Sequence, residues 1–405
     1  MDHKYKKTEI GIFPEDWKTE PLLKHVELLN GLTYSPENIK KNGLLVLRSS
    51  NVQESRIVLE DNVYVNCNVD KNKYLKKDDI LICVRNGSSN LIGKNAIANK
   101  NYVATFGAFM AVLRGKENRY IFQLLQKGDI QKNIKKNSSA TINQITTADF
   151  KSIQIPIPLK EEQKEIGDTL ATVDNLIDLL RKIIKKKEKI KNQVIIELLS
   201  GKNENMKTIN LSQIGYTYNG LTGMNSSNFV GGDKKYITFL NVLNNPIVKE
   251  EMFGRFHSDK IQNSVKKGDL FFNTSSEIPE EVAMCATIDH DVVNLYLNSF
   301  CFGFRITDQS VNNIYLSYYF RSIYGRSIMK TIAQGSTRFN LPKEKFLNYQ
   351  IKIHADVNKQ IEIAETLLNM DREIEKLNIK LGKYKKIKEG MMEDLLTGKV
   401  RLNYE

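Results

Sequence analysis

Four short polar segments carry the side chains that are best suited to chemistry. They are Arg85-Asn-Gly-Ser-Ser89, Ser138-Ser-Ala-Thr-Ile-Asn-Gln144, Asn273-Thr-Ser-Ser-Glu277 and Gly335-Ser-Thr-Arg-Phe-Asn340. Small hydroxyl and amide groups beside an arginine suit hydrogen bonds to phosphates and to base edges. Ser, Asn and Gly are also ordinary loop residues, so each segment taken alone is more typical of a plain turn. The recurrence of such segments at matching places in the two halves of the chain favours nucleic-acid contact.

These segments and neighbouring positions supply the predicted DNA contacts, with Arg85 and Arg338 as the candidate base readers of the two halves. The full set is Arg48, Ser49, Asn51, Arg85, Asn86, Ser88, Lys94, Thr141, Gln144, Asn241, Asn273, Thr274, Ser275, Ser336, Thr337 and Arg338.

The sequence shows no catalytic constellation. It lacks a P-loop, a G-x-G-x-x-G turn and a G-x-S-x-G elbow. The [ND]-P-P-[FYW] motif of adenine methyltransferases is approached only by Asn245-Pro-Ile247, without the second proline or the aromatic residue. The four cysteines stand far apart with no C-x-x-C, which predicts reduced thiols and no metal site. We therefore expect a binding chain that is not an enzyme.

The charge balance points to an acidic partner. The chain has 405 residues, with 60 Lys and Arg against 47 Asp and Glu, for a formal net charge of +13. A surplus of this size favours a nucleic acid or a membrane surface as partner. The opening Met1-Asp-His-Lys-Tyr-Lys-Lys has no apolar signal-peptide core, and no apolar stretch is long enough to cross a bilayer. We therefore expect a cytoplasmic protein with no membrane contact.

The chain is built from two copies of one plan. Residues 163–202 align without a gap on residues 360–399, and sixteen of the forty positions are identical, including Asp174 and Asp371. Shorter matches come earlier in the same order, such as Asn30-Gly-Leu-Thr33 with Asn219-Gly-Leu-Thr222. A common order of matches is the signature of an internal repeat.

The two similar segments predict long helices with a coiled-coil seam. Apolar residues alternate at spacings of four and three, and Gly201 and Gly398 are placed as stop signals. The predicted seam consists of Ile166, Leu170, Val173, Ile177, Leu180, Ile184, Ile363, Leu367, Met370, Ile374, Leu377 and Leu381.

The charges of these helices predict antiparallel pairing. Each begins acidic and turns basic, with six acids and one Lys over residues 161–178 and seven basic residues and one Glu over residues 181–191. Antiparallel pairing sets the acidic end of each helix against the basic end of the other. A basic helical run is usually a solvated face, although direct DNA binding by it stays an alternative. The charges nearly cancel within both segments, so +10 of the net charge lies in the other two blocks.

We therefore predict an α+β fold with two similar α/β domains, separated by two long helices that form an antiparallel coiled coil. The predicted domains are residues 1–159 and 203–358, and the helical segments are 160–202 and 359–405. Within the domains we expect buried strands at 80–85, 270–273, 110–113 and 300–306. Helical periodicity is expected at 120–133 and 314–331.

This pattern resembles the specificity subunits of type I restriction–modification systems over essentially the whole chain. Ile10-Gly-Ile-Phe-Pro-Glu-Asp-Trp-Lys18 is similar to the start of the family's first target-recognition domain, and Asp79-Ile-Leu-Ile-Cys-Val-Arg-Asn-Gly87 to its central strand and loop. Ile155-Pro-Ile-Pro-Leu-Lys-Glu-Glu-Gln163 resembles the boundary of a spacer helix. The second copy of that boundary, Ile353-His-Ala-Asp-Val-Asn-Lys-Gln360, lacks the proline.

The resemblance implies a double-stranded DNA partner whose bipartite, asymmetric site is read one half per domain. It also implies two modification subunits that methylate adenine and restriction subunits that translocate and cut, in a system of defence against foreign DNA. S-adenosylmethionine, ATP and Mg are then expected on those partners, and no cofactor on this chain. Two alternatives stay open: a recognition subunit of a related methyltransferase–nuclease assembly, or a coiled-coil adaptor whose basic domains bind protein.

Overall fold

The computed structural model describes residues 4–137, 144–200 and 205–402. The chain divides into two compact units, which are residues 1–181 with 379–405 (unit 1) and residues 182–378 (unit 2). The two long helices, α4 (Lys160–Leu199) and α10 (Val357–Leu395), each contribute one half to each unit. The domain boundaries expected from the sequence stay a prediction, because this division runs through the helices.

Unit 1 contains two four-stranded sheets. The first has the order β11-β10-β13-β4 and is antiparallel, and the second has the order β12-β6-β9-β5, in which β12 and β6 are parallel. Smaller pairs are β1-β2, β3-β14 and β7-β8. The strands are β1 Tyr5–Thr8, β2 Gly11–Pro14, β3 Lys18–Pro21, β4 Val26–Asn30, β5 Ile39–Lys40, β6 Leu44–Leu47, β7 Val52–Gln53, β8 Arg56–Ile57, β9 Val63–Val65, β10 Ile80–Cys83, β11 Asn95–Ile97, β12 Ala104–Phe106, β13 Met110–Gly115 and β14 Gln154–Ile157.

Unit 2 repeats this topology. Its antiparallel sheet has the order β21-β19-β23-β16, and its second sheet has the order β18-β17-β22, with β17 and β22 parallel. The remaining pairs are β15-β25 and β20-β24. The strands are β15 Met206–Asn210, β16 Gly215–Asn219, β17 Lys234–Ile237, β18 Phe253–Phe256, β19 Leu270–Asn273, β20 Ser275–Ser276, β21 Cys285–Thr287, β22 Leu295–Leu297, β23 Cys301–Ile306, β24 Phe339–Asn340 and β25 Gln350–His354. The antiparallel sheets have the same strand order, and β12-β6-β9 of the second sheet matches β22-β17-β18, which confirms the two similar α/β domains of the predicted fold.

Short helices pack on the antiparallel sheet of each unit. They are α1 Asn118–Gln126, α2 Gly128–Asn137 and α3 Thr147–Ser152 in unit 1, and α5 Leu211–Ile214, α6 Phe239–Asn244, α7 Asn313–Arg321, α8 Ile323–Ile332 and α9 Lys343–Leu347 in unit 2.

The expected helical periodicity at 120–133 and 314–331 is confirmed, and each stretch consists of two helices, α1 with α2 and α7 with α8. The backbone becomes extended at Lys127 and at Ser322, which ends α1 and α7. The Ser322 hydroxyl then accepts a hydrogen bond from the Gly325 amide and caps α8. A new cap starts a new helix direction although the apolar period continues.

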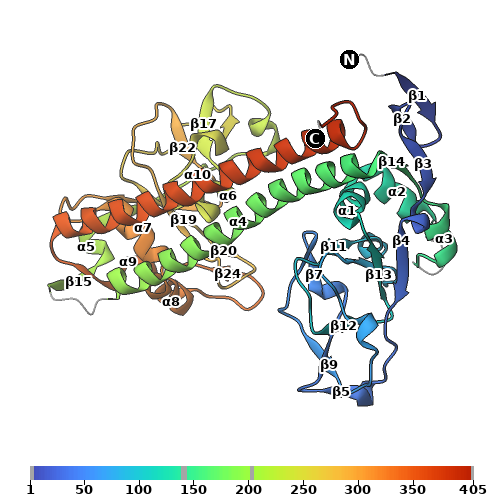
Figure 1. Cartoon of the computed structure of the whole chain (residues 1–405). Helices are drawn as coiled ribbons and strands as arrows, with labels where there is room; N and C mark the ends of the chain where they lie inside the picture. The colour runs from blue at the N-terminus through green and yellow to red at the C-terminus, as the bar shows by residue number, and fades with distance from the viewer. Residues whose placement is uncertain (1–3, 138–143, 201–204, 403–405) are drawn as a thin grey trace. The chain divides into compact units, whose positions relative to one another are not determined.

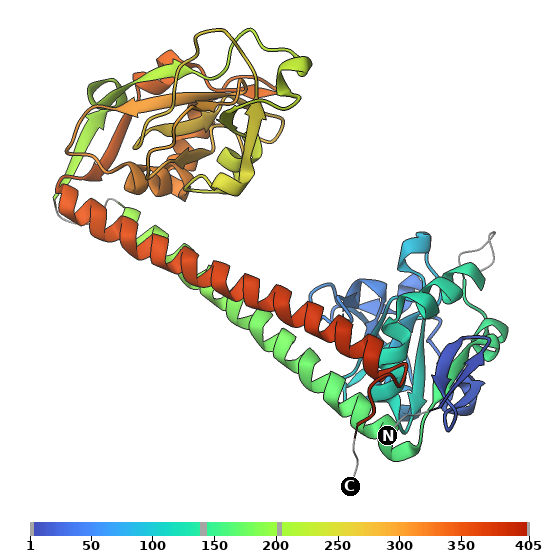
Figure 2. The same cartoon turned by 90° about the horizontal axis from the view of Figure 1, so that it is seen from above.

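The halves of α4 and α10 run side by side in antiparallel directions within each unit (Figures 1 and 2). In unit 1, Lys388 Nζ lies 2.7 Å from Asp174 Oδ1. In unit 2, Lys191 makes the equivalent ion pair with Asp371. Each partner is shifted by 197 residues from its counterpart, so the repeat generates two matching ion pairs. The predicted antiparallel arrangement is confirmed.

The same two aspartates also hold the short helices in place. Gln123 of α1 donates a hydrogen bond to Asp174 Oδ2 (2.7 Å), and the Tyr318 hydroxyl of α7 donates one to Asp371 Oδ2 (2.6 Å). Each aspartate therefore ties the helical pair to its own domain.

The predicted seam residues are all buried or half-buried. Some belong to the core of a domain, and the others lie along the helices. Ile166 and Leu170 belong to the core of unit 1, and Ile363 and Leu367 to the core of unit 2, because these helix ends pack against their domains. The other buried seam residues are Ile177, Leu180 and Ile184, and the half-buried ones are Val173, Met370, Ile374, Leu377 and Leu381.

Candidate nucleic-acid interface

A buried ion pair fixes the turn before the central strand of each unit. In unit 1 the carboxylate of Asp79 accepts hydrogen bonds from Arg114 Nε (2.8 Å), Arg114 Nη2 (2.6 Å) and the Lys76 amide (2.7 Å). The hydrogen bonds that Arg114 donates to the Asp79 carboxylate raise the pKa of Arg114. Unit 2 repeats the pair with Asp269 and Arg305 Nη2 at 2.7 Å. The repeated Lys-Lys-x-Asp turn thus anchors β10 and β19, whose far ends carry the predicted reading loops.

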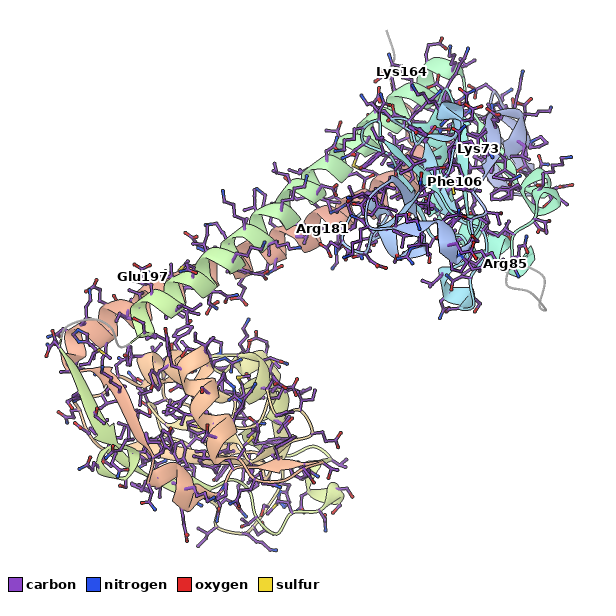
Figure 3. The ribbon with its side chains drawn as sticks, turned by 90° about the horizontal axis from the view of Figure 1, so that it is seen from below. Lys73, Arg85, Phe106, Lys164, Arg181 and Glu197 are labelled. Carbon is purple, nitrogen blue, oxygen red and sulfur yellow. The ribbon has the colours of Figure 1, made fainter. Side chains whose placement is uncertain are left out.

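The loop after β10 assembles the predicted contacts of unit 1. Asn86 Nδ2 donates to Ser49 Oγ at 3.2 Å across 37 residues of sequence, and Lys94 Nζ donates to the Ser49 carbonyl at 3.5 Å. Arg85 forms an antiparallel bridge with Gln144 and is exposed. Figure 3 shows Arg85 at the edge of unit 1. We call this group of residues, Ser49, Arg85, Asn86, Lys94 and Gln144, tip 1.

The other predicted contacts of unit 1 are divided. Ser88 is exposed beside tip 1, whereas Arg48 Nη2 pairs with Asp61 Oδ2 at 2.7 Å. Asn51 is buried, and its amide donates to the Val58 carbonyl at 3.0 Å. Thr141 lies outside the described residues.

Unit 2 has a matching site, but its arginine, Arg338, directly precedes β24, whereas Arg85 of unit 1 follows β10. β20 pairs with β24 where Arg85 bridges Gln144 in unit 1, and Arg338 Nε donates to Ser275 Oγ at 3.1 Å. Thr274 is half-buried next to Ser275. We call the group Thr274, Ser275, Ser336, Thr337 and Arg338 tip 2. Within it, Ser336 and Thr337 are exposed. Both tips present a guanidinium group beside small polar groups, and the polar side chains around the guanidinium differ between the two tips.

Two predicted contacts of unit 2 are structural. Asn241 is buried, and its side chain bonds both the amide (3.0 Å) and the carbonyl (2.8 Å) of Lys249. Asn273 is buried and donates to the Glu281 carbonyl at 2.9 Å. Asn51 has the same role as Asn241 at the matching repeat position. The repeated asparagines hold loops together, so their side chains are not presented to solvent in the way that the sequence predicted.

Sequence reasoning missed three residues beside the tips. Phe109 and Phe300 are exposed aromatic side chains in matching loops, and their common place in the repeat was the available signal. Lys343 contacts Asn219 Oδ1 beside the Phe302 ring, and burial lowers the pKa of Lys343. No sequence motif marks Lys343.

The described part of the chain contains no cluster of three or more His, Cys, Asp or Glu that could hold a metal ion. Burial raises the pKa of the Cys83 thiol next to tip 1, so that sulfur is held as an inert thiol. None of the described helices has the length and apolar content needed to span a bilayer.

Comparison with known proteins decides the family. The sequence model of the type I restriction modification DNA specificity domain matches residues 14–190 and again residues 203–382. The chain belongs to this family. The two matches cover one repeat each, and they confirm the resemblance seen in the sequence.

Named relatives and a solved structure agree with this assignment. The chain is 27% identical over 99% of its length to a putative type I restriction enzyme specificity subunit, MjaX, of Methanocaldococcus jannaschii, covering 97% of that protein. It is 32% identical over 177 residues to the StySPI specificity subunit of Salmonella potsdam, a match that spans 42% of this chain and only 38% of that relative. The crystal structure of a type I restriction–modification S subunit from M. genitalium superposes with a TM-score of 0.64 at 14% identity, covering 96% of this chain and 97% of the other. A structure from work on complex assembly of the type I system gives a TM-score of 0.51 at 12% identity.

Proposed function

We propose that this specificity-family chain reads a bipartite, asymmetric DNA site, with tip 1 on one half-site and tip 2 on the other. The observation that carries the proposal is the pair of tips: one backbone frame, repeated, with different polar side chains. A shared frame presents each reader to the groove in the same way, and different side chains select different bases.

The chain is proposed to act without chemistry of its own. Two modification subunits and the restriction subunits would dock on it and bring S-adenosylmethionine, ATP and Mg. The family assignment supports this division. The net charge of +13 suits duplex DNA as the partner.

Single arginine variants test the assignment of tips to half-sites. In the complex with its modification subunits, Arg85→Ala should weaken discrimination at one half-site and Arg338→Ala at the other, each by ~1–3 kcal/mol. Lys164→Ala is the matched control, because it also removes one exposed positive charge but lies far from Arg85 in unit 1 (Figure 3). Affinity is measured by titration against duplexes with single base changes.

The outcomes separate the candidate functions. Equal losses on every DNA sequence would make both arginines phosphate contacts, and losses at the same half-site would contradict the two-reader proposal. A protein-binding adaptor predicts that affinity of the complex for DNA is weak and nearly independent of salt. Our proposal predicts a steep negative slope of log affinity against log salt.

A further inference from the structure

Each tip has an exposed phenylalanine beside it. Phe109 is 54% exposed and Phe300 is 59% exposed. Each occupies the short loop that joins the parallel strand of the second sheet to the central antiparallel strand, β12 to β13 in unit 1 and β22 to β23 in unit 2. Single apolar residues are common on protein surfaces. The recurrence of an aromatic side chain at one loop position in two otherwise divergent domains calls for a common partner.

The backbone places the two phenylalanines identically. The Phe109 carbonyl accepts a hydrogen bond from the Val84 amide (3.0 Å), and the Phe300 carbonyl accepts one from the Thr274 amide (2.9 Å). Val84 and Thr274 are the residues immediately before Arg85 and Ser275. Each loop is thereby joined to the strand end that carries its tip.

Both loops approach a neighbouring glycine closely. A Cβ atom on Gly31 would lie 2.0 Å from the Gly107 carbonyl oxygen, and one on Gly220 would lie 2.1 Å from the Asn298 carbonyl oxygen. The repeated Asn-Gly-Leu-Thr sequence therefore serves to let these loops approach. The Phe300 amide also donates to Asn298 Oδ1 at 2.8 Å. The phenyl rings are thus presented to solvent by these loops.

The surroundings of the rings match those of a groove-reading surface. The Arg85 guanidinium carbon lies 5.3 Å from the centroid of the Phe109 ring, so a cation and an aromatic face are presented together. Near Phe300, the half-buried Thr274 supplies a hydroxyl group, whereas Ser275 is buried and its hydroxyl accepts a hydrogen bond from Arg338 Nε. An apolar ring flanked by hydrogen-bonding groups fits the base edges of the major groove, where the thymine methyl is the apolar group and the neighbouring atoms are polar.

We propose that Phe109 and Phe300 are specificity-determining residues, each packing against a thymine methyl group in its own half-site. The inference rests on the proposed function and deepens it, since it adds an apolar contact to the polar readout. Removal of the ring should weaken binding to the cognate site by roughly tenfold to a hundredfold, the range expected for an aromatic side chain left without its burial.

The test combines protein variants with DNA lacking single methyl groups. Phe109→Ala and Phe300→Ala, in the full chain assembled with its modification subunits, are titrated against duplexes in which each thymine is replaced in turn by deoxyuridine. With the native chain, one replacement in each half-site should lower affinity roughly four-fold, which is ~0.8 kcal/mol for one buried methyl group. In the variant that lacks the phenylalanine contacting this thymine, the same replacement should lower the affinity no further.

Two controls keep the result specific. Val103 is 80% exposed and lies before β12, at the end opposite Phe109, so Val103→Ala should leave DNA affinity unchanged. Phe109→Leu keeps an apolar side chain and should retain part of the affinity. Thermal unfolding of each variant should match that of the native chain, because the removed rings are exposed.

The failures are distinguishable. If Phe109→Ala and Phe300→Ala bind as the native chain does while Arg85→Ala and Arg338→Ala lose their half-sites, the phenylalanine inference is overturned and the proposed function stands. If the losses persist equally on every deoxyuridine duplex, contact with thymine methyl groups is refuted. If the native complex shows no preference for any DNA sequence, both proposals are wrong.

Discussion

Substitution of Asp79 by asparagine should destabilise unit 1 by about 3 kcal/mol. Asp79 is 2% exposed and Arg114 is 20% exposed, so the substitution removes one partner of a buried ion pair. Such a change costs ~3–5 kcal/mol, chiefly because the remaining charge is left uncompensated. Arg114 keeps hydrogen bonds to the carbonyls of Asn72 (2.8 Å) and Tyr74 (2.9 Å), which favours the lower end of that range. For a unit of this size, the melting temperature should fall by roughly 6–12 °C.

The chain contains its own local probe for this measurement. Trp17 is the single tryptophan and is buried in the core of unit 1. Its fluorescence during thermal unfolding therefore reports on unit 1. Asp269→Asn, the equivalent substitution in unit 2, should lower the transition seen by circular dichroism more than the one seen by Trp17.

Asp78→Asn is the matched control. The Asp78 side chain is 38% exposed and pairs with Arg119 Nε at 3.2 Å, an exposed pair that contributes only ~0–1 kcal/mol. Asp78 has a φ of 66°, a conformation that asparagine tolerates, so the backbone adds no strain. A Trp17 transition for Asp79→Asn that coincides with that of Asp78→Asn would refute the reasoning.

Three further outcomes are expected. Matched insertions of four residues in α4 and α10 add ~6 Å of helix. Methylome sequencing should then find the same half-sites separated by nearly two more base pairs. An unchanged gap would show that the helices do not set the distance between the half-sites. Gly31→Ala and Gly220→Ala should each abolish recognition of one half-site in binding assays, because a Cβ would collide with a backbone carbonyl oxygen. Gly128→Ala should not, because a Cβ at Gly128 would meet open space. The pKa of His290 is raised, chiefly by its hydrogen bond to Asp289, so the stabilising effect of His290 is full below pH ~6.5 and is lost as the pH rises through the folded-state pKa. In denaturant titrations, the difference in unfolding free energy between the native chain and His290→Gln should therefore shrink as the pH rises. An unchanged difference from pH 5 to pH 9 would contradict this.

The repeat was readable from the sequence because it depends on local patterns. Apolar spacing along residues 163–202 and 360–399 predicts two helices, and the acid-to-base gradient predicts that they run antiparallel. The pair of Asp174 with Lys388 follows from that gradient, because complementary charge needs no detailed packing to find its partner. The central strands β10 and β19 were also predictable from their apolar runs after a recurrent turn.

Which polar residues meet, and which are hidden, was decided only by tertiary structure. Nothing local shows that Asn86 contacts Ser49, or that Arg338 contacts Ser275 from the opposite strand. Such contacts depend on strand pairing between distant segments, which a local pattern does not encode.

Burial likewise depends on the whole fold. Asn51 has a polar side chain, as expected of a contact residue, but is buried. Phe109 has an apolar side chain, as expected of a core residue, but is exposed. Residue type sets only the free energy of transfer from water, and the surrounding backbone determines whether a side chain is transferred. The sequence by itself therefore determined the two-domain plan and the helices, and the tertiary structure determined which polar and aromatic side chains are exposed.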